Sequence, residues 1–235
     1  QDFINLNLTA IIKTFERPAI VARLIKSIRL QYPHLKIIVV DDSRTPVQHN
    51  NAITIQMPYD IGVSAGRNQA LMQVSTKYLM LFDDDFIFTR HTHVQAVLES
   101  IENHHEIDIV GGEVINLPFY RKTDYAHETL HPTDNISKLP AGSIIGGLPV
   151  FDKVPNFYIA KTSSINKIKW DPLLKRLDHA DFFTRAKGVL TIVYQHKFKV
   201  LHARTPFDMG YMFKRNEIEN DQRILQEKYY QTKIE

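Results

Sequence analysis

Apolar runs alternate with charged and turn-forming residues along the first half of the chain. Residues 8–15 and 36–40 are short and largely apolar, which is typical of strands buried on both faces of a sheet. Between them, Pro18 opens a stretch whose apolar residues recur every three to four positions, and this spacing predicts an amphipathic helix that ends at Pro33. The segment therefore predicts a β-α-β unit with two parallel strands.

The same alternation continues to residue 116. In chain order we expect a strand at 53–57, a helix from Val63, a strand at 78–82, a helix over 93–103 and a strand at 107–115. Strands that alternate with helices favour an α/β fold with a mostly parallel central sheet flanked by helices.

The second half is less regular. Residues 117–150 contain four prolines and only short apolar runs, and they predict an insertion or a pair of β-ribbons. Beyond it we expect strands at 154–160, 189–194 and 197–202 and a helix over 178–187. A polar C-terminal helix that carries Leu225 either covers the sheet or continues into a region outside this sequence. We therefore predict one domain over 1–235, with halves 1–116 and 117–235, the second containing a smaller β-rich region.

Composition narrows the class of protein. The 29 basic and 26 acidic residues give a net charge of +3 without a concentrated basic run, so we expect no nucleic-acid partner. The absence of cysteine excludes disulfides and thiol chemistry and favours a reducing compartment. No apolar run has the length of a membrane span. Because the chain begins at Gln1, we expect that it has been cut, processed or taken from a longer protein, and a lost anchor or neighbouring domain stays open.

Three consecutive aspartates, Asp83 to Asp85, follow the apolar run at 78–82. Adjacent carboxylates repel one another and lose hydration when buried, so they must lie at the exposed end of the strand or hold a cation. Ligands of open α/β sheets bind at this end of the strands, and a hard divalent cation that carries phosphates suits oxygen ligands. A solvated acidic turn is the alternative interpretation.

Further polar groups also fall at predicted strand ends or helix starts. They are Thr14 with Arg17, Asp41 with Asp42, and Arg67 with Asn68 in the small-residue loop that begins at Gly62. Small residues at a helix start let a phosphate approach the backbone, and Arg67 could add a forked contact. Each group alone is more often structural, but together they are the parts needed to hold a nucleotide diphosphate with a metal.

A second group of ionisable residues begins the helix predicted over 178–187. Asp178 and Asp181 share a helix face, and either carboxylate could accept a proton from an attacking hydroxyl. His179 is a third candidate base, since the unperturbed imidazole pKa lies near neutrality. Capping of the helix N-terminus is the alternative role for the two aspartates. His202, at the end of a predicted strand, could add a nitrogen ligand to a metal.

These segments together resemble a known family. They are similar to motifs of GT-A glycosyltransferases of the family-2-like type, in particular the β-1,4-N-acetylgalactosaminyltransferase (GM2/GD2-synthase-like) type. The segments are Lys13-Thr-Phe-Glu-Arg17, Val40-Asp-Asp-Ser43, Gly62-Val-Ser-Ala-Gly-Arg-Asn68, Leu81-Phe-Asp-Asp-Asp-Phe86 and Asp178-His-Ala-Asp-Phe-Phe183. The resemblance covers most of 8–116 and 156–202, and it implies a GT-A fold, a UDP-sugar donor, a glycan acceptor, a Mn²⁺ or Mg²⁺ ion and inversion at the anomeric carbon.

The resemblance also implies roles for single residues. Asp83 to Asp85 would form the DxD motif, with Asp85, Asp83 and His202 as metal ligands. The donor-binding set would consist of Thr14, Phe15, Arg17, Asp41, Asp42, Gly62, Ser64, Arg67, Asn68, Asp83 and Asp84. Many relatives carry Glu-Asp where this chain has Asp178-His179, so the catalytic base stays open among Asp178, His179 and Asp181.

The predicted reaction is a single displacement, in which the metal neutralises charge on the UDP leaving group and the base removes the acceptor proton. A non-catalytic UDP- or carbohydrate-binding module of a larger glycan-synthesising protein is the alternative. A nucleotidyltransferase would need a Gly-rich basic loop after the first strand, which Thr14-Phe-Glu-Arg17 is not. We expect a cytoplasmic enzyme, at the inner face of a bacterial membrane, that builds surface glycans. Asn-x-Ser/Thr sequences at Asn7 and Asn135 leave secretion as the alternative, because they are acceptor sites for N-glycosylation.

Overall fold

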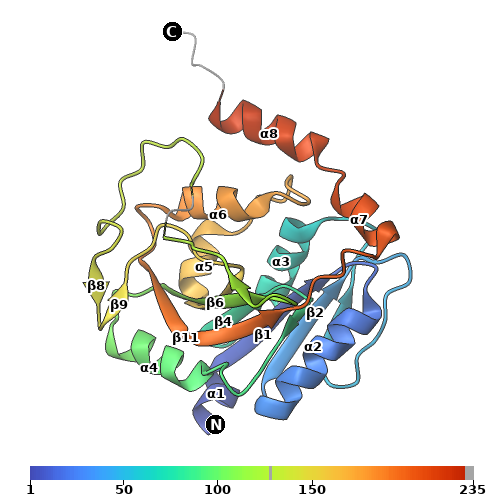
Figure 1. The fold of residues 1–235 in the computed structure, drawn as a ribbon, viewed down its shortest axis with the longest axis horizontal. Coiled ribbons are helices and arrows are strands. Elements are labelled where there is room, and N and C mark those ends of the chain that lie inside the picture. Colours follow the sequence, from blue (N-terminus) through green and yellow to red (C-terminus); the bar gives the residue numbers. More distant parts are fainter. Residues whose placement is uncertain (127–128, 231–235) are drawn as a thin grey trace.

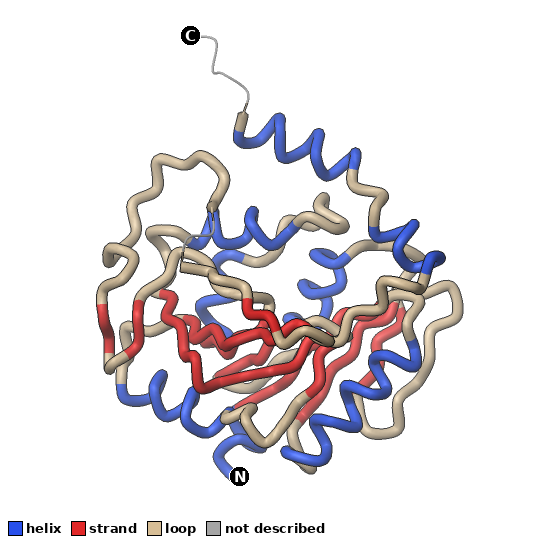
Figure 2. The backbone as a smooth tube through the Cα atoms, in the orientation of Figure 1, coloured by secondary structure: helices blue, strands red, loops and turns tan. Residues whose placement is uncertain are grey.

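A computed structural model describes residues 1–126 and 129–230. Its centre is a nine-stranded sheet with helices on both faces (Figures 1 and 2). The strands are β1 (Leu8–Thr14), β2 (Lys36–Asp41), β3 (Ile53–Gln56), β4 (Tyr78–Phe82), β5 (Phe86–Ile87), β6 (Ile109–Asn116), β7 (Arg121–Lys122), β8 (Ile144–Ile145), β9 (Leu148–Pro149), β10 (Phe157–Lys161) and β11 (Ile192–His202). The helices are α1 (Asp2–Asn7), α2 (Pro18–Gln31), α3 (Val63–Met72), α4 (Val94–Asn103), α5 (Thr162–Ile168), α6 (Asp178–Ala186), α7 (Met209–Arg215) and α8 (Glu219–Tyr229).

The sheet has the order β3-β2-β1-β4-β10-β6-β11-β5, and β7 pairs with β6 outside this path. Strands β3, β2, β1 and β4 run parallel, and β6 and β11 are parallel to each other, while β10 is antiparallel to both β4 and β6. The mostly parallel α/β sheet predicted from the sequence is therefore confirmed. Because Thr14 lies opposite Asp41 in the register of β1 and β2, the motifs that follow these strands meet at one edge of the sheet.

Two apolar cores explain why the helices cover both faces. Successive strand residues point to opposite faces, so Ala10 and Ile12 belong to one core and Ile11 to the other. The first core packs against the apolar stripes of α2 and α4, and the second against α3, α5 and α6. In Figure 1, α2 and α4 accordingly lie on the opposite side of the sheet from α3, α5 and α6.

Several elements differ from the prediction. The two strands expected at 189–194 and 197–202 are one strand, β11, with a register shift between Gln195 and Lys199. Helices α1, α5 and α7 were not predicted, because they are only six or seven residues long and too short to show helical periodicity. Within 117–150 the described residues form one two-stranded ribbon, β8 with β9, and the short β7 at the sheet edge.

The C-terminal helix does not cover the sheet, which was one of its two expected arrangements. It lies beyond α6, on the far side from the sheet (Figure 1). Asp221, in the first turn of α8, accepts hydrogen bonds from the backbone nitrogens of Arg176 at 2.6 Å and Leu177 at 2.9 Å. This helix therefore supports the loop that leads into α6.

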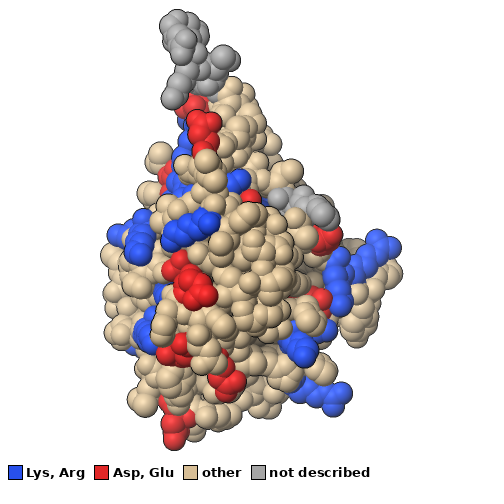
Figure 3. Space-filling model, turned by 90° about the vertical axis from the view of Figure 1, so that its left-hand side faces the viewer, with Lys and Arg blue, Asp and Glu red and all other residues tan. Residues whose placement is uncertain are grey.

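On the face shown in Figure 3, basic and acidic side chains are interspersed, without a continuous stripe of one sign. Among the helices of residues 1–126 and 129–230, none combines the length and apolar character needed to cross a bilayer.

Candidate active site

A cleft of about 500 Å³ opens at the carboxyl ends of β1 and β4, next to the start of α6. The sheet contributes Thr14 and the three aspartates that follow β4, and α6 contributes Asp178. Helix α7 closes one side with Tyr211 and Arg215. Part of the polar groups predicted at strand ends is thus brought together around one cavity, namely Thr14, Arg17, Arg67 and Asp83 to Asp85.

Arg17 joins two of the three consecutive aspartates. Its guanidinium donates to Asp84 and, at 3.1 Å, to Oδ2 of Asp85. The Thr14 hydroxyl donates to the other oxygen of Asp84 at 2.7 Å. Burial raises the pKa of Asp84 to about 6, against the opposing charge of Arg17. The ring of Tyr211 lies 3.8 Å from the Arg17 guanidinium, so α7 packs directly on this ion pair.

Arg67 joins the remaining carboxylates. This arginine, 3% exposed, donates to Asp178 and, at 2.9 Å, to Oδ1 of Asp83. The Asp83 side chain is 39% exposed, far more than those of Asp84 and Asp85, so Asp83 is the most accessible carboxylate of the three. Burial raises the pKa of Asp178, and the charge of Arg67 opposes this shift.

His202 and Asp85 face each other across 3.2 Å, from Nε2 to Oδ1. Asn116 donates through Nδ2 to the Arg121 carbonyl at 3.1 Å, which turns its Oδ1 toward His202 Nδ1 at 2.9 Å. Nδ1 must then carry the proton of this bond, so Nε2 of a neutral His202 presents a lone pair to Asp85.

Asp85 Oδ1 is buried and accepts no hydrogen bond from the part of the chain that the structure describes. A proton or a metal ion must therefore lie between it and Nε2. Burial disfavours the ionised form of Asp85, but with a proton on Nε2 the hydrogen bond and charge of His202, together with Arg17, outweigh burial and lower the pKa of Asp85 to about 2.

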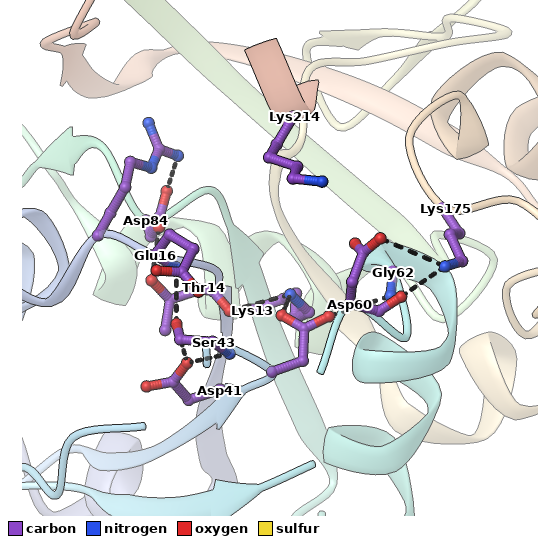
Figure 4. A network of polar contacts seen from close by, with 12 residues as sticks. Lys13, Thr14, Glu16, Asp41, Ser43, Asp60, Gly62, Asp84, Lys175 and Lys214 are labelled. Atoms are coloured by element: carbon purple, nitrogen blue, oxygen red, sulfur yellow. Dashed lines mark hydrogen bonds and ion pairs between the residues drawn. The ribbon is translucent and has the colours of Figure 1, made fainter. Parts of the chain in front are cut away.

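The two aspartates that end β2 do not enter the cleft. Asp41 holds the loop after β2, because its carboxylate accepts from the backbone nitrogens of Ser43 at 2.9 Å and Val47 at 3.1 Å. Asp42 is paired with Lys13, and it is Lys13 that lines the cleft, together with Phe15. Figure 4 shows Lys13 between Thr14 on one side and Gly62 and Asp60 on the other.

The three candidate bases of α6 occupy different environments. Asp178 and His179 line the cleft. His179 Nε2 donates to the Val154 carbonyl at 2.7 Å, and burial, together with the charge of Lys153, lowers the pKa of His179 to about 3. Asp181 is fully buried on the side of α8, where it accepts from Lys228 at 2.6 Å and Tyr229 at 2.7 Å. The structure therefore brings Asp178 and His179 to the cleft and not Asp181.

The remaining residues of the predicted donor set shape the loop and helix start next to the cleft. Gly62 has φ +94° and donates its N–H to Asp42 at 3.0 Å. Asn68 binds the backbone of Trp170 through both ends of its amide, at 2.7 Å and 3.0 Å. Ser64 is fully buried. None of these three is among the residues that line the cleft described above.

Sequence reasoning did not assign a role to Lys13, Asn116 or Tyr211. Lys13 had a signal, because a charged residue inside an apolar strand needs a buried partner. Asn116 lies at the end of β6 and Tyr211 on a helix without buried residues, so neither has a local signal in the sequence.

Comparison with known proteins agrees with this geometry. Residues 9–169 match the model of the family described as glycosyl transferase family 2. Beta-1,4 N-acetylgalactosaminyltransferase 2 of Mus musculus is 34% identical over 185 residues, which cover 77% of this chain and 36% of that protein. Beta-1,4 N-acetylgalactosaminyltransferase 1 of Rattus norvegicus is 33% identical over 219 residues, 86% of this chain and 41% of that protein. The chain thus spans about two fifths of these relatives.

Solved structures of S. aureus TarS 1–349 share the fold. The complex with UDP-GlcNAc has a TM-score of 0.65 at 18% identity and covers 85% of this chain and 59% of that chain. The complex with UDP has a TM-score of 0.64 at 18% identity, covering 94% of this chain and 70% of that chain. The GT-A fold expected from the resemblance is confirmed, and the chain belongs to glycosyl transferase family 2.

Proposed function

We propose that this chain transfers a sugar from a UDP-sugar to a glycan hydroxyl, with a divalent metal ion and with inversion at the anomeric carbon. The observation that carries the proposal is the meeting of four carboxylates at one cleft, where Arg17 and Arg67 each bind two of them. The relatives named as N-acetylgalactosaminyltransferases and the TarS complexes with UDP-GlcNAc and UDP support this class of donor.

The residues present fit a divalent metal ion. Asp85 offers a buried oxygen that accepts no hydrogen bond within the described residues, and His202 turns Nε2 toward it. One carboxylate oxygen and one imidazole nitrogen would suit Mn²⁺ better than Mg²⁺, which prefers oxygen ligands, when phosphate oxygens complete the shell. Within residues 1–126 and 129–230 no group of three or more His, Asp or Glu side chains is placed to hold a metal ion, so phosphate oxygens of the donor would have to complete the shell.

The chain's own residues would divide the work of the reaction. Asp85 and His202 would hold the metal, which supplies positive charge to the diphosphate leaving group. Asp83, the most accessible of the three aspartates, would contact the sugar or ribose of the donor. Asp178 would take the proton of the acceptor hydroxyl, because it lies at the cleft and burial raises its pKa toward the range of a useful base.

Arg67 would hold Asp178 in place for this step, since it donates to Asp178 and Asp83 at once. His179 would be a poorer base, because its low pKa makes the neutral imidazole a weak proton acceptor. The donor sugar would be an N-acetylhexosamine, with N-acetylgalactosamine favoured by the names of the relatives at 33% and 34% identity.

The test is donor hydrolysis and transfer with UDP-GalNAc, UDP-GlcNAc, UDP-Gal and UDP-Glc, each with Mn²⁺ or EDTA. We expect turnover that needs the metal, and a loss of turnover in Asp85→Asn. The anomeric configuration of the product, read by NMR, decides whether the sugar is inverted. Metal-dependent binding of UDP without hydrolysis or transfer of any sugar would contradict the enzyme and favour the binding module.

A further inference from the structure

The end of the cleft next to β2 contains a lysine that the proposed chemistry does not use. The Lys13 side chain is 7% exposed and lines the cleft beside Phe15. Its Nζ donates to the Thr14 carbonyl at 2.9 Å and to Oδ1 of Asp42. An ammonium group has three N–H donors. Within the described residues these two bonds are the hydrogen bonds that Nζ donates, so one of its N–H groups remains for a ligand in the cleft.

Asp42, by contrast, does not line the cleft. It is fully buried, its Oδ1 accepts from Lys13, and its Oδ2 accepts from the Gly62 nitrogen at 3.0 Å. Its backbone carbonyl accepts from the Asp60 nitrogen at 3.0 Å. Asp42, a member of the predicted donor-binding set, therefore holds Lys13 at the cleft.

The position of the Lys13 ammonium is fixed on several sides. A Cβ added at Gly66 of α3 would lie 2.5 Å from Lys13 Cδ, so the lysine stem lies directly against the backbone of this helix. The Phe15 ring centroid lies 5.6 Å from Nζ. A hydrogen-bond donor fixed in this way can distinguish a ligand group that accepts a hydrogen bond from one that donates.

An ammonium group can only donate hydrogen bonds, so the ligand group that binds it must be an acceptor. In the proposed function the diphosphate lies at Asp83 to Asp85, and Lys13 and Phe15 are then residues of the same cleft that can contact the nucleobase. The part of a pyrimidine farthest from the ribose is its C4 position. Uracil presents a carbonyl oxygen there, whereas cytosine presents an amino group, which is a donor and would face the Lys13 donor without a bond.

We infer that Lys13 donates its third N–H to the C4 carbonyl of uracil and selects UDP-sugars over CDP-sugars, with Asp42 as the residue that positions it. The inference rests on the proposed function, because it assumes a pyrimidine nucleotide in the cleft. It extends the proposed function by naming Lys13 as the residue that determines which nucleobase the cleft binds.

The test is calorimetric binding of UDP and CDP with Mn²⁺ to the wild type, to Lys13→Met and to Lys13→Met/Asp42→Asn. The double variant leaves no unpaired carboxylate at position 42. Lys175→Met is the matched control, because Lys175 lines the same cleft but donates to the Asp60 carbonyl at 2.6 Å. We expect the wild type to prefer UDP by about tenfold or more, as a hydrogen bond to a charged donor allows.

Both Lys13 variants should bind the two nucleotides within about threefold of each other, whereas Lys175→Met should weaken both alike and keep the preference. A folded Lys13 variant that keeps the preference would overturn the inference, as would equal binding by the wild type. If the variants do not fold, 4-thio-UDP decides on the wild type: its weaker sulfur acceptor should bind less well than UDP, and equal binding overturns the inference. Binding of neither nucleotide by the wild type would contradict the proposed function itself.

Discussion

Arg67 of α3 and Asp178 of α6, 111 positions apart in the chain, form a buried ion pair beside the three consecutive aspartates. The same guanidinium reaches Asp83 at 2.9 Å. One side chain thus connects the strand end that carries the acidic motif to the helix that carries the candidate base. The two halves of the cleft are positioned relative to each other by this contact.

Removal of the Arg67 charge should be strongly destabilising. Arg67→Met would leave Asp178 and Asp83 without a cationic partner, and breaking a buried ion pair costs about 3–5 kcal/mol of the free energy of unfolding. Urea unfolding measures this change. Arg223→Met is the control, because Arg223 pairs with Glu227 on the surface of α8 with its side chain 63% exposed. That variant should change stability by less than about 0.5 kcal/mol. Equal effects of the two variants would contradict the role given to Arg67.

Asp178→Asn should separate catalysis from donor binding. If Asp178 accepts the acceptor proton, its amide variant should lower kcat by about 10² or more, with the UDP dissociation constant changed little. Steady-state kinetics and calorimetry measure the two quantities. Full activity of this variant would show that a residue other than Asp178 is the catalytic base.

Asp181→Asn is the matched variant on the same helix. Asp181 accepts from Lys228, Tyr229 and Arg185 away from the cleft, so its amide should lower stability by about 2 kcal/mol and leave kcat of the folded protein near that of the wild type. A selective loss of kcat in Asp181→Asn, with stability unchanged, would reverse the two assignments.

The sequence located the cleft because the ends of parallel strands meet at one sheet edge, and Asp83 to Asp85 follow directly after β4. It could not distinguish Asp178 from Asp181, since both share a helical spacing. Their difference comes from Arg67 on one side of α6 and Lys228 on the other, contacts that depend on how distant helices pack. The environment of Asp42 depends on the same kind of contact: its strand-end position was predicted, but its pairing with Lys13 is a tertiary contact.

His179 should make folding stability depend on pH. Burial lowers its folded pKa from 6.5 to about 3, so between these values the unfolded chain binds a proton that the folded chain does not. His179 therefore does not lower the free energy of unfolding above pH 6.5. As the pH falls below this value, His179 lowers the free energy of unfolding by at most about 1.4 kcal/mol per pH unit.

His179→Gln keeps a side-chain N–H for the Val154 carbonyl but cannot titrate. Its free energy of unfolding should fall less steeply than that of the wild type between pH 6.5 and pH 5, as urea titrations at each pH would measure. Identical slopes for the two proteins would mean that His179 is protonated as easily in the folded state as in the unfolded chain.

Asn116 should control metal affinity without touching the metal. Its Oδ1 accepts from His202 Nδ1 at 2.9 Å, and this bond fixes the tautomer that leaves Nε2 free to face Asp85. Partners of this kind orient metal-binding histidines, and their loss lowers metal affinity by about 10- to 100-fold. Asn116→Ala should therefore weaken Mn²⁺ binding in the presence of UDP by this factor, as electron paramagnetic resonance titration of free Mn²⁺ would show.

Asn116→Asp separates this effect from a general disturbance of β6, because a carboxylate at position 116 still accepts from Nδ1. It should retain most of the Mn²⁺ affinity, and the two variants should have similar melting temperatures, since the Asn116 side chain lies at the end of the strand. If Asn116→Ala binds Mn²⁺ as tightly as the wild type while His202→Ala does not, His202 would be a metal ligand whose tautomer needs no help from Asn116. If neither variant affects Mn²⁺ binding, His202 would not be a ligand, and its 3.2 Å approach to Asp85 would be an ion pair of the protein alone.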